Sequence, residues 1–382
     1  MVYLVSLIYL LAILLYFCKI KSNFYYKILC IIFVLPIIFI DLVDVLSPTG
    51  YIDIIRMYDE MHTLRILGWD GLNEYNEAPL SKLYLYLISL TGSNHLLSIV
   101  NCFFVYFLLL YIIYKVGNKL KIADRINCLG ILFIAMSIKY ATVNTNIRHP
   151  LAITIFFVIL MYDLIGHKNR VCCLIGYIVS ILLHPSMIIL LCIRIISRFS
   201  LKYSIIIIGF LGFICINYWE DIPSIILSFT NIDFIVGLVA KQQVYTLRAQ
   251  DDIEIYSTYW KISSLMINML GIIFSVLLMK YLTPLLYTRF KVLIRMNILV
   301  SLIGFVLIVL TPESGGRIES VVLYTVAIYF YIVSNKENFK LSAIGYNNLK
   351  IVLLGLLPLW LIYFVYFNIY LFTKYFSFKF FV

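Results

Sequence analysis

Long apolar runs recur from one end of this 382-residue chain to the other, and short polar stretches separate them. Many of these runs approach the roughly 20 residues that an α-helix needs to cross the hydrocarbon core of a bilayer. The runs lack the alternation within segments of about ten residues that is typical of membrane β-barrels. The pattern therefore predicts an all-α, polytopic helical membrane protein that forms a single integral membrane domain over residues 1–382.

The pattern predicts about twelve hydrophobic elements. They lie near residues 2–18, 28–46, 95–114, 126–141, 150–166, 171–184, 186–197, 203–218, 259–279, 292–310, 321–334 and 351–373. The first element has neither a charged n-region nor a small-residue cleavage site before it ends. We therefore expect a membrane helix there rather than a signal peptide.

The sixth and seventh elements are too short to cross a bilayer separately. They are the two halves of the apolar stretch 171–197, which is interrupted by His184–Pro185–Ser186 and has basic residues at both ends. Because basic residues favour the inner side, both ends are expected on the same side of the membrane. The stretch is therefore predicted to be a short re-entrant-like hairpin with His184 at its tip, and irregular backbone at that depth is tolerated where it lines a cavity.

The charge distribution predicts the orientation. If the N-terminus lies outside, the inner side carries 19 of the 30 lysines and arginines and only three acidic residues, Asp124, Asp163 and Glu337. The positive-inside rule therefore favours an N-out, C-out protein. The net charge of +11 then reflects topology, and no basic stripe with interleaved aromatic residues indicates a nucleic-acid partner.

The eight cysteines fall in apolar elements or at their inner ends, so no disulfide framework is expected. No cluster of histidines, cysteines and carboxylates has the spacing of a metal site, and no phosphate loop or nucleotide-binding glycine motif is present. The sequence thus predicts neither a metal nor a cofactor.

Fourteen of the 19 acidic residues lie in three predicted outer loops, which are expected to form the active-site face. These loops are residues 47–94, 219–258 and 311–320. The first contains apolar residues at helical spacing, which predict an amphipathic helix lying on the outer leaflet. A shorter apolar stretch from Ala78 to Leu90 is predicted to be interfacial or re-entrant, and Thr311 to Arg317 is expected to form a compact turn.

Candidate chemistry begins where the fifth element starts on the outer side, with Arg148, His149 and Pro150 as its first helical residue. A helix N-terminus and an arginine both suit phosphate. Asn144 and Asn146 precede them. The alternative interpretation is that Arg148 reaches out to lipid phosphates.

His184 is a candidate base or a hydrogen-bond donor to a diphosphate, and its alternative is a structural histidine in a turn. Arg317 is a second candidate for anion binding, because it is also an arginine at the predicted outer start of a helix. Its alternative is an ion pair with Glu313 or Glu319. Arg248 is a third candidate cation. Asp163 is expected to pair with Lys168 or with a lipid-facing cation.

Two motifs carry a resemblance to a known family. Asn144-x-Asn146-x-Arg148–His149, followed by Leu183–His184–Pro185–Ser186, is similar to the EpsG-type branch of the Wzy O-antigen and capsular polysaccharide polymerases. Tyr58–Asp59, Glu77–Ala78–Pro79 and Gly316–Arg317 also resemble the family pattern. His149 stands where glutamine is expected in that family, and Pro185 intervenes before Ser186.

The resemblance implies a membrane glycosyltransferase of the bacterial cytoplasmic membrane. Such an enzyme joins undecaprenyl-diphosphate-linked oligosaccharide repeat units on the outer face into O-antigen, capsule or exopolysaccharide. Its partners would be that lipid-linked oligosaccharide, membrane lipids, a chain-length regulator and a flippase. The implied roles are diphosphate binding by Arg148, Arg317 and Arg248, base catalysis by His184, by His149 or by a carboxylate of an outer loop, and substrate contacts by Asn144, Asn146, Tyr58, Asp59 and Glu77.

Three other functions remain open at this stage. A ligase or another polyprenyl-linked glycosyltransferase would use similar arginines. A transporter or flippase would show inverted repeats with broken helices in matching halves, whereas only one broken element is evident. A membrane acyltransferase would also use histidine and arginine.

Overall fold

The computed structural model describes residues 2–39, 53–71, 78–165, 169–218, 258–310, 312–341, 345–347 and 350. These residues form helices and their connections, with an isolated β-bridge between Leu282 and Phe339. The helices are α1 (Val2–Phe17), α2 (Ser22–Phe39), α3 (Asp53–Leu67), η2 (Gly68–Gly71), α4 (Pro79–Ser89), α5 (His95–Lys119), α6 (Asp124–Ser137), α7 (Tyr140–Thr145), α8 (Arg148–Ile165), α9 (Arg170–Leu183), α10 (Met187–Ile196), α11 (Leu201–Tyr218), α14 (Thr258–Tyr281), α15 (Pro284–Leu310), α16 (Pro312–Val333) and η3 (Lys336–Asn338).

Each predicted hydrophobic element overlaps one of these helices, except the last, near 351–373, which lies outside the described residues, as do residues 40–46 of the second. Within the described part of the chain, five helices are long and apolar enough to cross a membrane: α5, α8, α14, α15 and α16. The protein is therefore all-α and has the helices of a multi-pass membrane protein.

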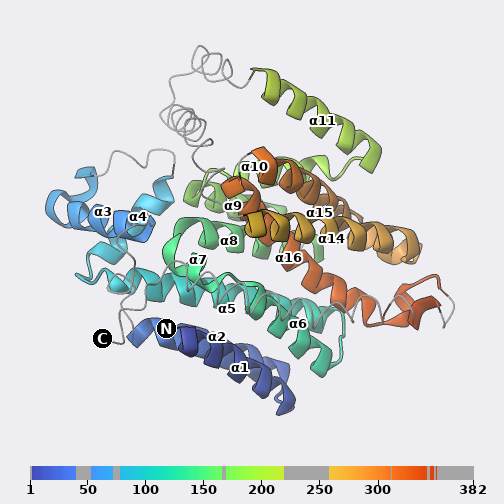
Figure 1. The fold of residues 1–382 in the computed structure, drawn as a ribbon, viewed down its shortest axis with the longest axis horizontal. Coiled ribbons are helices and arrows are strands. Elements are labelled where there is room, and N and C mark those ends of the chain that lie inside the picture. The colour runs from blue at the N-terminus through green and yellow to red at the C-terminus, as the bar shows by residue number, and fades with distance from the viewer. Residues whose placement is uncertain are drawn as a thin grey trace.

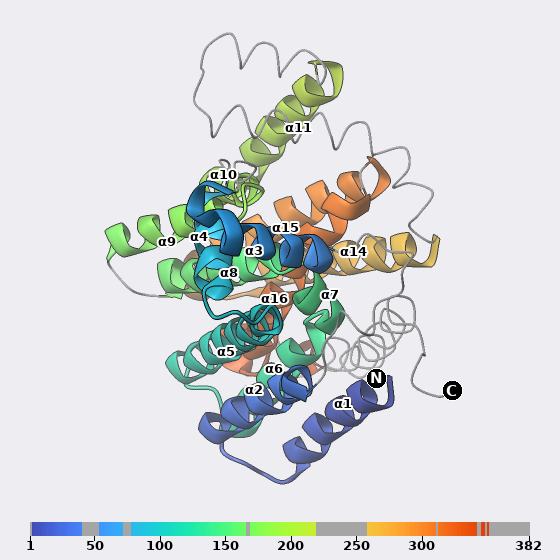
Figure 2. The ribbon, with the colours of Figure 1, turned by 90° about the vertical axis from the view of Figure 1, so that its left-hand side faces the viewer.

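The long helices run side by side in one bundle (Figure 1). Helix α5 packs against α2, α6, α8 and α16, and the three helices α14, α15 and α16 pack on one another. Helices α3 and α4 lie together at one end of the bundle, in front of α8 and α9 when the molecule is turned (Figure 2). They contact each other, and α4 also contacts α9.

Small residues and buried amides allow close helix contacts inside the bundle. Asn297 on α15 donates to the carbonyl of Gly271 on α14 at 3.3 Å and to the Ser275 hydroxyl at 2.9 Å. The same hydroxyl lies 2.9 Å from the Tyr329 hydroxyl on α16. Such small and polar residues join apolar helices where the surrounding lipid gives no hydrophobic driving force.

The predicted amphipathic helix in the 47–94 loop is confirmed as α3, which buries Ile54, Met57 and Met61 on one face. Arg65 fastens this helix to the rest of the loop, because its Nε donates to the Ser89 carbonyl at 3.0 Å. The predicted short apolar element is α4. These two helices form a fixed layer over one end of the bundle.

Polar contacts join parts of the chain that are far apart in sequence but that the charge pattern assigns to the same side of the membrane. The Ser22 backbone N–H donates to Asp124 at 3.1 Å, and the Lys340 N–H donates to the Tyr281 carbonyl at 2.9 Å. These residues belong to predicted inner segments. At the opposite helix ends, the Asn101 side chain donates to the Val143 carbonyl at 2.5 Å.

Candidate functional site

The chain is broken twice between α6 and α8, and polar residues occupy both breaks. Helix α6 ends at Ser137, Ile138 is extended, and Lys139 caps the six-residue α7. Asn146 then ends α7 with φ −113° and ψ 52°. The sequence pattern predicted one element ending near residue 141, and it missed the first of these breaks.

Helix α8 begins at Arg148, so Pro150 is its third residue rather than its first as predicted. The difference has a simple cause. The first four N–H groups of a helix have no partner within it, so a proline without an N–H is tolerated anywhere in the first turn. Arg148 itself therefore stands at the positive end of the helix, with its Nε buried.

The predicted break between the sixth and seventh elements is confirmed. Helix α9 ends at Leu183, His184 is extended with φ −151° and ψ 114°, and α10 begins after Ser186. The Ser186 backbone N–H donates to His184 Nδ1 at 3.4 Å, and the Ser186 hydroxyl lies 2.8 Å from the same nitrogen. Because a backbone N–H only donates, Nδ1 is the acceptor, and the neutral ring carries its hydrogen on Nε2.

The two histidines that the sequence offered as alternatives lie in contact. The ring centroids of His149 and His184 are 5.1 Å apart, and the ring planes cross at 83°. His149 is 8% exposed, whereas His184 is half-buried. The start of α8 and the tip of the α9–α10 hairpin therefore meet through two imidazoles.

Two cations from other segments act electrostatically on His149. They are Arg317 of α16 and Lys139, the cap of α7. The Lys139 ammonium also lies 3.0 Å from the carboxylate of Glu319, whose side chain is 1% exposed. Glu319, one of two residues expected as partners of Arg317, is thus paired with Lys139. The side chain of the other, Glu313, lies outside the described residues.

The compact turn predicted from Thr311 to Arg317 is wrong. Helix α16 begins at Pro312, so Arg317 lies in its second turn rather than before its start. Proline fits the first position of a helix because its fixed φ is already helical. The glycines that suggested a turn, Gly315 and Gly316, lie inside the helix.

Helix α4 contributes residues that the sequence interpretation missed. The Ser81 hydroxyl donates to the Leu183 carbonyl at 2.5 Å, directly before His184. The next residue, Lys82, is largely buried, and its ammonium lies 4.7 Å from the ring centroid of Trp69. The one charged residue of the 78–90 stretch, Lys82, was the sequence feature that pointed to a functional role for this helix.

The remaining predicted site residues have different surroundings. Tyr58 is buried on α3 and Asp59 is exposed, and α3 contacts α7. Asn144 is fully buried, and its amide donates to the Tyr140 carbonyl at 2.8 Å within α7. Asn146 is half-buried. Arg248 and Glu77 lie outside the described residues.

The described side chains near the two imidazoles include three cations and one carboxylate. The cations are Lys139, Arg148 and Arg317, and the carboxylate is Glu319. Guanidinium groups and imidazole N–H groups suit a phosphate-type anion. Among the side chains that the structure describes, no group of three or more histidines, cysteines or carboxylates is arranged to hold a metal ion.

No protein-family model matches this chain, and no curated protein or solved structure matches it either.

Proposed function

We propose that this protein is a polysaccharide polymerase of the bacterial cytoplasmic membrane. It joins undecaprenyl-diphosphate-linked oligosaccharide repeat units on the outer face. The observation that carries the proposal is the contact of His149 with His184 at 5.1 Å, with Arg317 and Lys139 acting on the same imidazole. Glycosyl transfer from a diphosphate leaving group needs fixed cations and a proton acceptor in one place.

The proposed orientation has both termini outside, which puts the His149–His184 contact at the outer ends of the helices. The excess of lysine and arginine in the opposite segments supports this orientation. The α9–α10 hairpin then enters the membrane from the inner side and returns to it, and α3 and α4 lie at the outer surface. The apolar faces between the helices are suited to a polyprenyl chain.

In the proposed reaction, the bond between the anomeric carbon of the growing chain and its diphosphate breaks, and the electron pair leaves with the diphosphate. A hydroxyl of the incoming unit forms the new glycosidic bond and gives its proton to a base. Arg148 and Arg317 stabilise the charge that develops on the leaving diphosphate. Arginine is suited to this because its fork matches phosphate oxygens.

The hydrogen bonding of His184 favours a donor role in this reaction. Its Nδ1 accepts from the Ser186 N–H, so Nε2 carries the hydrogen that donation to a diphosphate oxygen requires. His149, which packs against it from α8, is then the proposed proton acceptor, and the bound diphosphate would offset the Arg317 and Lys139 charges that oppose a proton on this ring. The two imidazoles, which were alternative candidates for the base, thus take different roles in this proposal.

The test is to replace Arg148 or His184 by alanine in the native cell and to separate the surface glycan on a gel. We expect both variants to lose the ladder of long chains and to retain single capped units. His62→Ala and Arg56→Ala are matched controls, because both residues are exposed on α3. A full ladder in both test variants would contradict the proposal.

The same experiment separates the rival functions. A ligase variant would accumulate lipid-linked chains of many lengths without transferring them. A flippase variant would also lose the single capped units, because no repeat unit would reach the outer face. The breaks around α7 and at the hairpin tip are features that transporters share, so the retained capped unit is the decisive band.

A further inference from the structure

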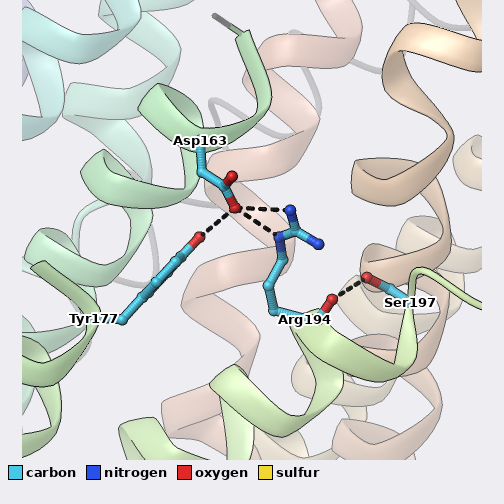
Figure 3. Close-up of polar contacts among 4 residues, drawn as sticks. All are labelled: Asp163, Tyr177, Arg194 and Ser197. Atoms are coloured by element: carbon cyan, nitrogen blue, oxygen red, sulfur yellow. Dashed lines mark hydrogen bonds and ion pairs between the residues drawn. The ribbon is translucent and has the colours of Figure 1, made fainter. Parts of the chain in front are cut away.

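A single carboxylate oxygen ties three helices together away from the histidine contact (Figure 3). Asp163 Oδ2 on α8 accepts a hydrogen bond from the Tyr177 hydroxyl of α9 at 3.1 Å. The same atom accepts from Arg194 of α10, at 3.1 Å from Nε and 2.7 Å from the terminal nitrogen. The predicted partner Lys168 lies outside the described residues, and the observed partner is Arg194.

These three residues, which we call the clamp, hold both arms of the hairpin. Tyr177 precedes the tip residue His184, and Arg194 follows it. Because both side chains reach one oxygen, the two arms must return alongside the same part of α8. Two of the contacts between α8 and the hairpin are therefore far apart, one through His149 at its first turn and one through Asp163 about four turns later, roughly 20 Å along the axis.

Burying the two charges of the clamp among apolar residues costs free energy. The Arg194 side chain is 6% exposed and that of Asp163 is 22% exposed. An ion pair of this kind is no more stabilising than well-packed apolar residues of the same volume, so its advantage is direction rather than strength. The Ser197 hydroxyl further fixes the end of α10 by donating to the Arg194 carbonyl at 2.7 Å (Figure 3).

Apolar packing alone would define the position of the hairpin poorly. The arms are rich in isoleucine and leucine, whose contacts are not directional. Gly176 lets α9 approach Ile159 of α8 closely, but it does not prevent sliding along the axis. Near the tip, the Ser81 hydroxyl bonds only the Leu183 carbonyl. Among the described side chains, those of the clamp bond both arms to one residue of α8.

We infer that Asp163, Tyr177 and Arg194 are positioning residues, which set the depth of the α9–α10 hairpin so that His184 meets His149. The positioning itself is independent of the reaction. Its consequence for glycan assembly rests on the proposed function. A loss of the clamp should therefore change the distance between the two histidine positions first, and change activity only through that distance.

Cross-linking measures the positioning without reference to activity. His149→Cys and His184→Cys are combined in full-length protein whose exposed Cys18, Cys172 and Cys192 are serine. A protease site between α8 and α9 then reports whether a short bifunctional thiol reagent has joined the two halves. Without the site cysteines, only background linkage is expected.

The clamp is removed by Asp163→Leu together with Arg194→Met, which leaves no unpaired charge buried. We expect cross-linking to fall several-fold while the protein still elutes as a folded species, and Tyr177→Phe to have a smaller effect. Asp124→Asn is the matched control, because Asp124 also accepts several bonds but joins α2 to α6. Unchanged cross-linking in the clamp variant would overturn the inference.

The glycan ladder of the same clamp variants, with both histidines present, separates this inference from the proposed function. Reduced cross-linking with a reduced ladder supports both. Reduced cross-linking with a normal ladder keeps the clamp and counts against a catalytic histidine pair. Normal cross-linking overturns the clamp whatever the ladder shows.

Discussion

The Lys139 ammonium lies 3.0 Å from the Glu319 carboxylate and joins the break between α6 and α7 to the second half of the chain at α16. Both side chains are largely buried, at 14% and 1% exposed. The pair brings the cap of a six-residue helix next to the segment that carries Arg317. It therefore holds together the surroundings of His149, on which Lys139 and Arg317 both act.

Glu319→Gln should destabilise the protein by about 3 kcal/mol, because the change leaves the Lys139 charge buried without its counter-charge. The measurement is the free energy of unfolding in detergent, followed by helical circular dichroism. Lys139→Gln combined with Glu319→Gln should lose less than the single variant, since no charge remains to be neutralised. Equal losses in the single and double variants would show that the two side chains are not coupled.

The hydrophobic pattern predicted most helices well because each depends on a local property. A run such as His95–Lys119 is apolar whatever it packs against, and Pro185 interrupts the chain wherever the hairpin lies. The amphipathic helix α3 was equally predictable from the sequence, since its buried positions recur at helical spacing. Local chemistry also singled out His149 and His184 separately.

Pairings between residues far apart in the sequence could not be predicted from local properties. Asp163 has basic neighbours in sequence, yet its carboxylate reaches Arg194, because the hairpin returns alongside α8. Gly315 and Gly316 suggested a turn, yet they lie inside a helix that starts at Pro312. In the first case the return of the hairpin along α8 decided the partner, and in the second a helix start at Pro312 outweighed the turn preference of the glycines.

Gly130→Ala should destabilise the bundle by about 1–3 kcal/mol through overpacking. A Cβ at Gly130 would meet the ring and hydroxyl of Tyr331, which donates to Asn127 Oδ1 at 2.7 Å. Gly209→Ala in α11 is the matched control, because a Cβ there meets nothing within 4 Å. The control should be neutral or more stable by up to about 1 kcal/mol. The measurement is thermal unfolding of both variants in detergent. A Gly130 variant as stable as the control would contradict the close contact between Gly130 and Tyr331.

Ser81→Ala should loosen the contact between α4 and the hairpin tip. Its hydroxyl donates to the Leu183 carbonyl at 2.5 Å, and removal leaves that buried acceptor unsatisfied at a cost of about 1–3 kcal/mol. Under the proposed function, the glycan ladder should also become fainter because His184 follows Leu183 directly. Ser89→Ala is the control on the same helix, since its hydroxyl donates within α4, to the Tyr86 carbonyl at 2.7 Å. Equal effects of both variants on stability and ladder would rule out a special role for the Ser81 contact.

Substitutions of Arg148 and Arg317 should separate diphosphate binding from lipid contact. Arg→Gln removes the charge that would oppose the leaving diphosphate, so each variant should lower the polymerisation rate by about 10²–10³-fold. Arg→Lys keeps the charge but loses the bidentate fork, so a partial loss is expected. The measurement is the rate of ladder formation after induction of the variant in cells, with Arg56→Gln on the exposed face of α3 as the control. If Arg148 only contacts lipid phosphates, Arg148→Gln will match this control while Arg317→Gln remains defective. If both variants match the control, neither arginine binds the leaving group.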